Sequence, residues 1–98
     1  MQEFAMLAPD HSLASDAEFG VEYTAPTNGW VFWCADIDEV SAELSVWINW
    51  SECFVYSSAV SKDSWGMFPV MDEDTWIVQL GGAKPRWIKF VPCVELLV

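Results

Sequence analysis

Hydrophobic and polar residues alternate with a period of two through much of the chain after residue 18. Residues 19–23, 44–50 and 86–91 show this alternation, which is typical of strands that bury one face. Residues 30–35 are apolar at every position, which predicts a strand covered on both faces. Further strands are expected over residues 54–56, 65–70, 75–80 and 94–98.

Turn-forming residues separate these segments, and helical spacing is almost absent. The segment 25–29 combines Pro with Asn-Gly, residues 71–74 form a tight acidic turn, and residues 81–85 are expected to be a flexible hairpin loop. Only residues 36–43 have a weak helical spacing, which allows at most one short helical turn. About seven strands joined by turns predict a single all-β domain, an antiparallel β-sandwich or jelly roll.

The chain of 98 residues is long enough for one domain, which we place at residues 19–98. Residues 1–18 have a mixed pattern and are interpreted as an N-terminal arm able to cross onto a neighbouring chain.

The aromatic content is high for this length, with seven Trp, six Phe and two Tyr. Each such side chain brings about 150–250 Å² of surface, so one small core does not hold all of them. The excess is expected in a subunit interface or a ligand site. Trp33 and Trp47 are out of phase with the better core faces, and together with Trp65 and Trp87 they are the candidate interface or ligand-binding residues.

The net charge of −11 comes from 15 acidic and four basic residues. Such a chain repels phosphate backbones and anionic lipid surfaces, so neither nucleic acid nor a membrane is an expected partner. The same charge keeps an apolar chain in solution. No apolar run approaches the roughly 20 residues that span a bilayer, and no signal peptide is expected.

The residue types that carry chemistry are few and scattered. Cys34, Cys53 and Cys93 match neither a disulfide framework nor a CxxC zinc pair, so we expect buried, reduced thiols without metal. The only histidine, His11, could act as a general base only if the arm folded back against Cys34 or Cys53. We therefore expect no enzyme, no catalytic residues and no cofactor.

Two acidic groups offer the oxygen ligands that calcium prefers, Asp36 with Asp38 and Glu39, and residues 72–74. Neither has the spaced Asp/Asn-Gly pattern of a dedicated calcium loop, so solvated turns are expected. Whether these turns bind calcium stays open at this point. Two carboxylates close together could also serve a glycosidase, but with 15 acidic residues such pairs arise by chance.

Residues 23–30, Tyr-Thr-Ala-Pro-Thr-Asn-Gly-Trp, resemble the YTAP-x-x-G-[WY] segment of small bacteriophage appendage proteins. These are β-sandwich modules of virion fibres, tail tips and head decorations. Weaker similarities at residues 9–13, 68–70 with 74–75, and 90–92 extend the resemblance over residues 9–93. The chain departs from the pattern in its acidic turn at residues 71–73, which is usually basic or Gly-containing, and in its higher Trp content.

The resemblance implies a virion structural protein, made in the bacterial host cytoplasm and often trimeric, without cofactor or catalytic residues. Its expected partners are other copies of itself, other virion proteins and a host-surface glycan. The alternative function is a carbohydrate-binding module that stacks exposed Trp residues on sugar rings. Trp residues at subunit contacts would favour the first function, and an open strip of Trp rings the second.

Overall fold

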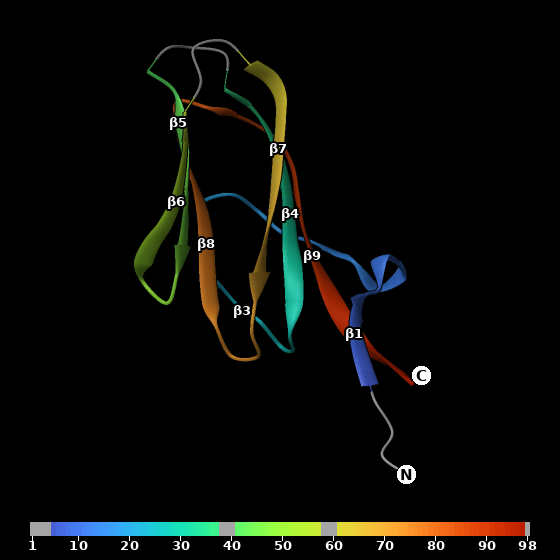
Figure 1. The fold of residues 1–98 in the computed structure, drawn as a ribbon. Coiled ribbons are helices and arrows are strands. Elements are labelled where there is room, and N and C mark those ends of the chain that lie inside the picture. Colours follow the sequence, from blue (N-terminus) through green and yellow to red (C-terminus); the bar gives the residue numbers. More distant parts are fainter. Residues whose placement is uncertain (1–4, 38–40, 58–60, 98) are drawn as a thin grey trace.

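The computed structural model describes residues 5–37, 41–57 and 61–97. Within these ranges the chain forms nine strands in two antiparallel sheets and one short 3-10 helix, η1 (His11–Leu13). One sheet has the order β1-β9-β4-β7, with β2 also paired to β9, and the other has the order β3-β8-β5-β6 (Figure 1). The strands are β1 (Ala5–Pro9), β2 (Ser15–Asp16), β3 (Tyr23–Thr24), β4 (Gly29–Ile37), β5 (Glu43–Ile48), β6 (Ser51–Ser57), β7 (Ser61–Val70), β8 (Thr75–Gly81) and β9 (Lys84–Leu97).

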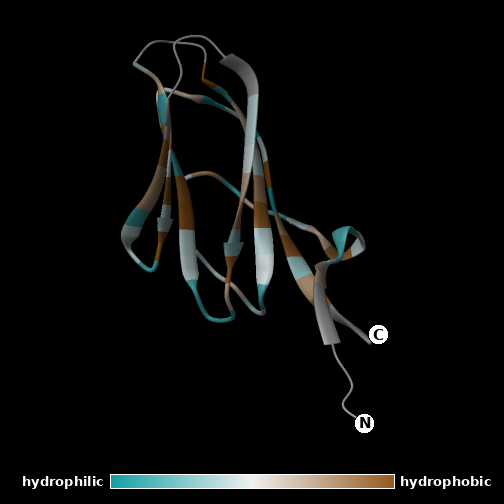
Figure 2. Ribbon diagram, in the orientation of Figure 1, coloured by the Kyte–Doolittle hydropathy of each residue, from teal (hydrophilic) through white to brown (hydrophobic). Residues whose placement is uncertain are grey.

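The two sheets pack face to face, which confirms the all-β sandwich predicted from the period-two pattern. In Figure 2 the strongest apolar colour lies on the central strands. Alternate residues of β4, β5, β7 and β8 point between the sheets and are almost completely buried, so the core is built from one face of each strand. Its largest members are Trp33, Trp76, Phe68, Ile37 and Leu44.

The chain passes repeatedly from one sheet to the other. Among successive strands, β5 and β6 pair as a hairpin, whereas β4–β5, β6–β7, β7–β8 and β8–β9 each connect the two sheets. The prediction of a hairpin loop at residues 81–85 was therefore wrong, because β8 and β9 lie in different sheets. Gly82 has φ +87, which agrees with the glycine turn expected at this point of the chain. Turn residues, however, do not determine which strands pair.

The N-terminal segment completes the first sheet of its own chain. Strand β1 pairs with the end of β9, with Ala8 opposite Val94, and β2 pairs with its middle, with Ser15 opposite Phe90. Between them, the Asp10 side chain accepts the N–H of Ser12 at 3.0 Å and caps η1. Figure 1 shows β1 and the end of β9 projecting together beyond the sandwich.

No helix was predicted at residues 11–13, whereas a helical turn was allowed at residues 36–43. In the structure Ile37 ends β4 and Glu43 begins β5, and residues 38–40 lie outside the described part of the chain.

Candidate functional site

An apolar row crosses the outer face of the first sheet. Cys34 of β4 lies opposite Trp65 of β7 on one side and opposite Trp87 of β9 on the other. Phe32, two residues before Cys34, lies opposite Met67. Residues paired in this way share a face and contact one another, so these five side chains form one surface, here called the outer strip.

The outer strip exposes its large side chains to solvent. Trp65 is 67% exposed, Met67 49% and Trp87 45%, whereas Cys34 lies beneath them at 8%. The three exposed side chains present about 300–400 Å² of apolar surface, from the usual areas of such residues. Apolar patches of this size on small proteins often mark binding sites. A standard protein–protein interface covers about 800 Å² per partner, so the strip is large enough to form the centre of one.

The edge of the outer strip carries most of the positive charge of the chain. Lys84, Arg86 and Lys89 flank Trp87 on β9 and are three of the four basic residues. The Nε of Arg86 donates to Asp36 at 3.1 Å, and the Nζ of Lys89 lies 3.9 Å from Asp16. These basic residues offset part of the acidic charge near the outer strip, which reduces the repulsion between two acidic copies at this surface.

A groove of about 320 Å³ adjoins the outer strip beside Trp87. One wall is the segment 17–19, which leads away from β2, and the other is the start of β9 from Pro85 to Ile88. The groove extends from Trp87 toward Phe19, so the surface beside the outer strip is concave at this end.

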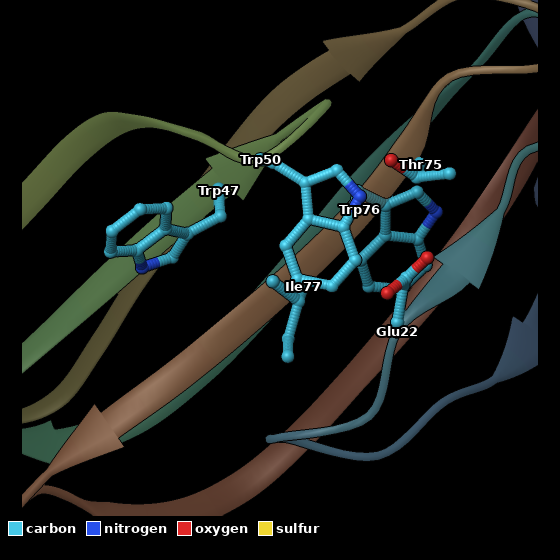
Figure 3. Close-up of a pocket in the computed structure, with 6 residues that line it drawn as sticks. All are labelled: Glu22, Trp47, Trp50, Thr75, Trp76 and Ile77. Atoms are coloured by element: carbon cyan, nitrogen blue, oxygen red, sulfur yellow. The ribbon is translucent and has the colours of Figure 1, made fainter.

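A second aromatic surface lies on the other sheet, around the β5–β6 hairpin. Trp47 of β5 lies opposite Ile77 of β8, and Trp50 in the hairpin turn is 69% exposed. Figure 3 shows the indole rings of Trp47 and Trp50 on either side of Ile77, with a gap between them, Trp76 behind Trp50 and Glu22 beside Trp50. We call the surface formed by Trp47, Trp50 and Glu22 the indole platform.

The turn that carries Trp50 has an unusual backbone. Ile48 pairs with Ser51, and the two residues between them have positive φ, 51° at Asn49 and 66° at Trp50. A two-residue hairpin turn with both φ values positive is of type I′, for which Asn-Gly is the preferred sequence. The chain keeps the Asn but places the bulkiest side chain where glycine is favoured.

Hydrogen bonds from Asn49 fix this turn to the acidic turn at residues 71–74. The Nδ2 of Asn49 donates to Asp74 at 2.9 Å, and the N–H of Thr75 donates to the Oδ1 of Asn49 at 2.9 Å. The backbone N–H of Asn49 also donates to the carbonyl of Thr75 at 2.8 Å. Asn49 therefore makes three hydrogen bonds, two as donor and one as acceptor, and they fix the backbone next to Trp50.

Asp74 acts as an acceptor within this network. The side-chain amide of Asn49 and, secondly, the backbone N–H of Met71 donate to its carboxylate and hold the pKa of Asp74 below its ordinary value of 3.8. The carboxylate thus takes part in the fold through these bonds, and residues 71–73 are exposed to solvent, as expected for this turn.

This lowered pKa predicts a specific acid dependence of stability. A depressed folded-state pKa contributes stability above the unfolded-state pKa, and that contribution is lost as the pH falls through the folded value. We expect the melting temperature of the wild type to fall as the pH drops below 3.8, and Asp74→Asn to lack that part of the dependence. Asp72→Asn, which keeps the backbone bond from residue 72 to Asn28, is the matched control. Parallel pH profiles for wild type and Asp74→Asn would contradict the role of Asp74.

The four Trp residues singled out from the sequence lie in three different places. Trp65 and Trp87 meet on the outer strip, and Trp47 lies on the indole platform, where its indole N–H donates to Ser45 at 3.1 Å. Trp33 is 1% exposed and lies in the core, so its placement outside the core faces was wrong. Residues 30–35 are apolar on both faces, so their pattern does not reveal which face is inner.

Sequence reasoning did not identify Met67, Trp50 and Glu22 as site residues. Met67 follows from the alternation of β7 once Trp65 is known to point outward. Trp50 had been assigned to a strand that in the structure ends at Ile48, and the Asn at position 49 was the available turn signal. Glu22 reaches the indole platform only through the fold.

The histidine and the cysteines are the other residues that could take part in catalysis or metal binding. The ring of His11 lies 5.4 Å from that of Phe32. None of the three cysteines is in a disulfide. Cys34 is buried as expected, but Cys53 is exposed and Cys93 is only partly buried, contrary to the expectation of buried thiols. In the described ranges, no group of three or more His, Cys, Asp or Glu is placed to hold a metal ion. No helix in the described part of the chain is long and apolar enough to cross a membrane.

Comparison with known proteins gives no relative. No protein family, no curated protein and no solved structure matches this chain. A functional proposal therefore depends on the two aromatic surfaces and on the resemblance noted in the sequence.

Proposed function

We propose that the chain is a structural module that acts by self-association through the outer strip, as a component of a virion. The observation that carries this proposal is the exposure of Trp65 and Trp87 on either side of Cys34. The virion context is supported by the similarity of residues 23–30 to bacteriophage appendage proteins. A trimer is the subunit number that this similarity implies.

Burial of the outer strip provides enough free energy for association. If two copies each cover about 300–400 Å², the apolar surface removed from water contributes at most about 15–20 kcal/mol. The loss of translational and rotational freedom opposes this by about 4–15 kcal/mol. The balance favours assembly when the partner surface is well matched.

The position of β7 provides a second argument for self-association. Among the described strands, this ten-residue strand is the last in its sheet and pairs with β4, so its other edge presents backbone donors and acceptors. Such edges pair with other chains unless they are blocked, and Pro69 removes only one N–H. A copy docked on the outer strip would also cover this edge.

The net charge of −11 gives a salt dependence that tests the proposal. The Debye length falls from about 30 Å at 0.01 M salt to about 8 Å at 0.15 M, so repulsion between copies weakens as salt is added. We expect sedimentation equilibrium to give a larger oligomeric fraction at about 0.15 M than at about 0.01 M salt. A mass of 11.1 kDa at both salt concentrations and at high protein concentration would contradict self-association.

The structure divides the Trp residues that the alternative function, a carbohydrate-binding module, would use. Trp33 is buried in the core, Trp65 and Trp87 lie on the outer strip, and Trp47 lies on the opposite sheet. Trp47 lines a hollow on that sheet together with Trp50 and the buried Trp76.

A further inference from the structure

We infer that the indole platform binds the face of a neutral sugar ring. The platform lies on the sheet opposite the outer strip, so this binding site is separate from the surface proposed for self-association. It consists of the rings of Trp47 and Trp50 with the carboxylate of Glu22 at their edge (Figure 3).

The backbone at Trp50 is the first argument for a ligand. A residue other than glycine at φ 66 is strained, and a large side chain that is 69% exposed recovers little of that cost by packing. Strained backbone of this kind concentrates at functional sites. Because neither the exposure nor the backbone strain of Trp50 stabilises the fold, we attribute its position to a ligand that covers the ring.

The platform is also held rigidly before any ligand arrives. Asn49 fixes the turn through its bonds to Asp74 and Thr75. Trp47 is held by the bond from its indole N–H to Ser45 and by its place opposite Ile77. A fixed pair of aromatic rings loses little conformational entropy on binding, which is the property required for weak stacking ligands.

The shape and charge of the platform indicate the class of ligand. The hollow among its residues does not admit a water-sized sphere, so it cannot enclose a quaternary ammonium group as an aromatic cage does. The net charge of −11 opposes anionic ligands. A sugar ring fits both limits, because its C–H face stacks on a flat indole while its hydroxyl groups donate to a carboxylate such as Glu22 and to the hydroxyl of Thr75.

The test follows the indole N–H signals of the full chain by ¹⁵N NMR during titration with cellohexaose, maltohexaose and N-acetylchitohexaose. Each sugar is added to about 10 mM, which is ten times a Kd of about 1 mM. At least one of the three sugars is expected to shift the indole N–H signals of Trp47 and Trp50 but not those of Trp65 and Trp87. Tetramethylammonium is the charged comparison and is expected to shift neither pair. The absence of shifts with all three sugars, or shifts with tetramethylammonium alone, would overturn the inference.

Variants separate this site from the outer strip. Trp50→Gly creates the preferred Asn-Gly turn, so the protein is expected to melt at or above the wild-type temperature while its sugar affinity falls at least about tenfold. Trp65→Ser, on the other sheet, is expected to keep the sugar affinity and to weaken self-association. Unchanged sugar affinity in Trp50→Gly overturns the sugar site, whereas unchanged self-association in Trp65→Ser counts against the outer strip alone.

Discussion

Replacement of Trp33 by alanine is expected to lower the free energy of unfolding by about 3–5 kcal/mol. Trp33 is 1% exposed at the centre of β4, and its ring lies against Gly66, where an added Cβ would be 2.6 Å from the Cζ2 of Trp33. Truncation leaves a cavity that β4, held between β7 and β9, cannot close. Because a domain of this size has a total stability of about 5–15 kcal/mol, urea denaturation should show a much lower midpoint.

Two further variants test whether the lost stability comes from the core position of Trp33 or from the removal of any tryptophan. Trp65→Ala removes an exposed ring and is expected to change the stability of the monomer by less than about 0.5 kcal/mol. Gly66→Ala forces the Trp33 ring to shift and is expected to cost about 1–3 kcal/mol. Equal stability of the Trp33→Ala and Trp65→Ala variants would place Trp33 outside the core.

Simultaneous replacement of Trp65 and Trp87 by serine is expected to weaken self-association at least about 100-fold in Kd. The two rings supply most of the exposed apolar area of the outer strip, and Trp residues at the centre of interfaces contribute about 2 kcal/mol or more each. The fold should persist, because both side chains point away from the core. Sedimentation equilibrium of the double variant measures the effect.

The matched control for this double variant is Trp50→Ser. Trp50 is as exposed as Trp65 but lies on the opposite sheet, so its replacement is expected to leave the association constant unchanged. If all three positions weaken assembly equally, then the association is a general effect of apolar surface and does not depend on the outer strip.

The sequence predicts the fold class well because strand periodicity is a local property. Alternation over residues 44–48 and 86–91 reports directly that one face of each strand is buried. The pattern fails at residues 30–35, where both faces are apolar and the inner position of Trp33 is not distinguishable from the outer position of Cys34.

The outer strip was only half predictable for a different reason. Trp65 and Trp87 were candidates, but their meeting around Cys34 depends on β4 lying between β7 and β9. Strand order is a property of the whole fold and leaves no local pattern in the sequence. The indole platform was missed because the alternation continues through Trp50, and the turn at Asn49 lacks the glycine that usually marks it.

Hydroxyl-radical footprinting of the wild-type protein tests association through the outer strip. Side-chain oxidation is compared at low protein concentration and at a concentration where the protein is oligomeric. We expect Trp65, Met67 and Trp87 to become protected on association, while Trp50 stays as reactive as before. Protection of Trp50 with continued oxidation of Trp65 and Trp87 would contradict association through the outer strip.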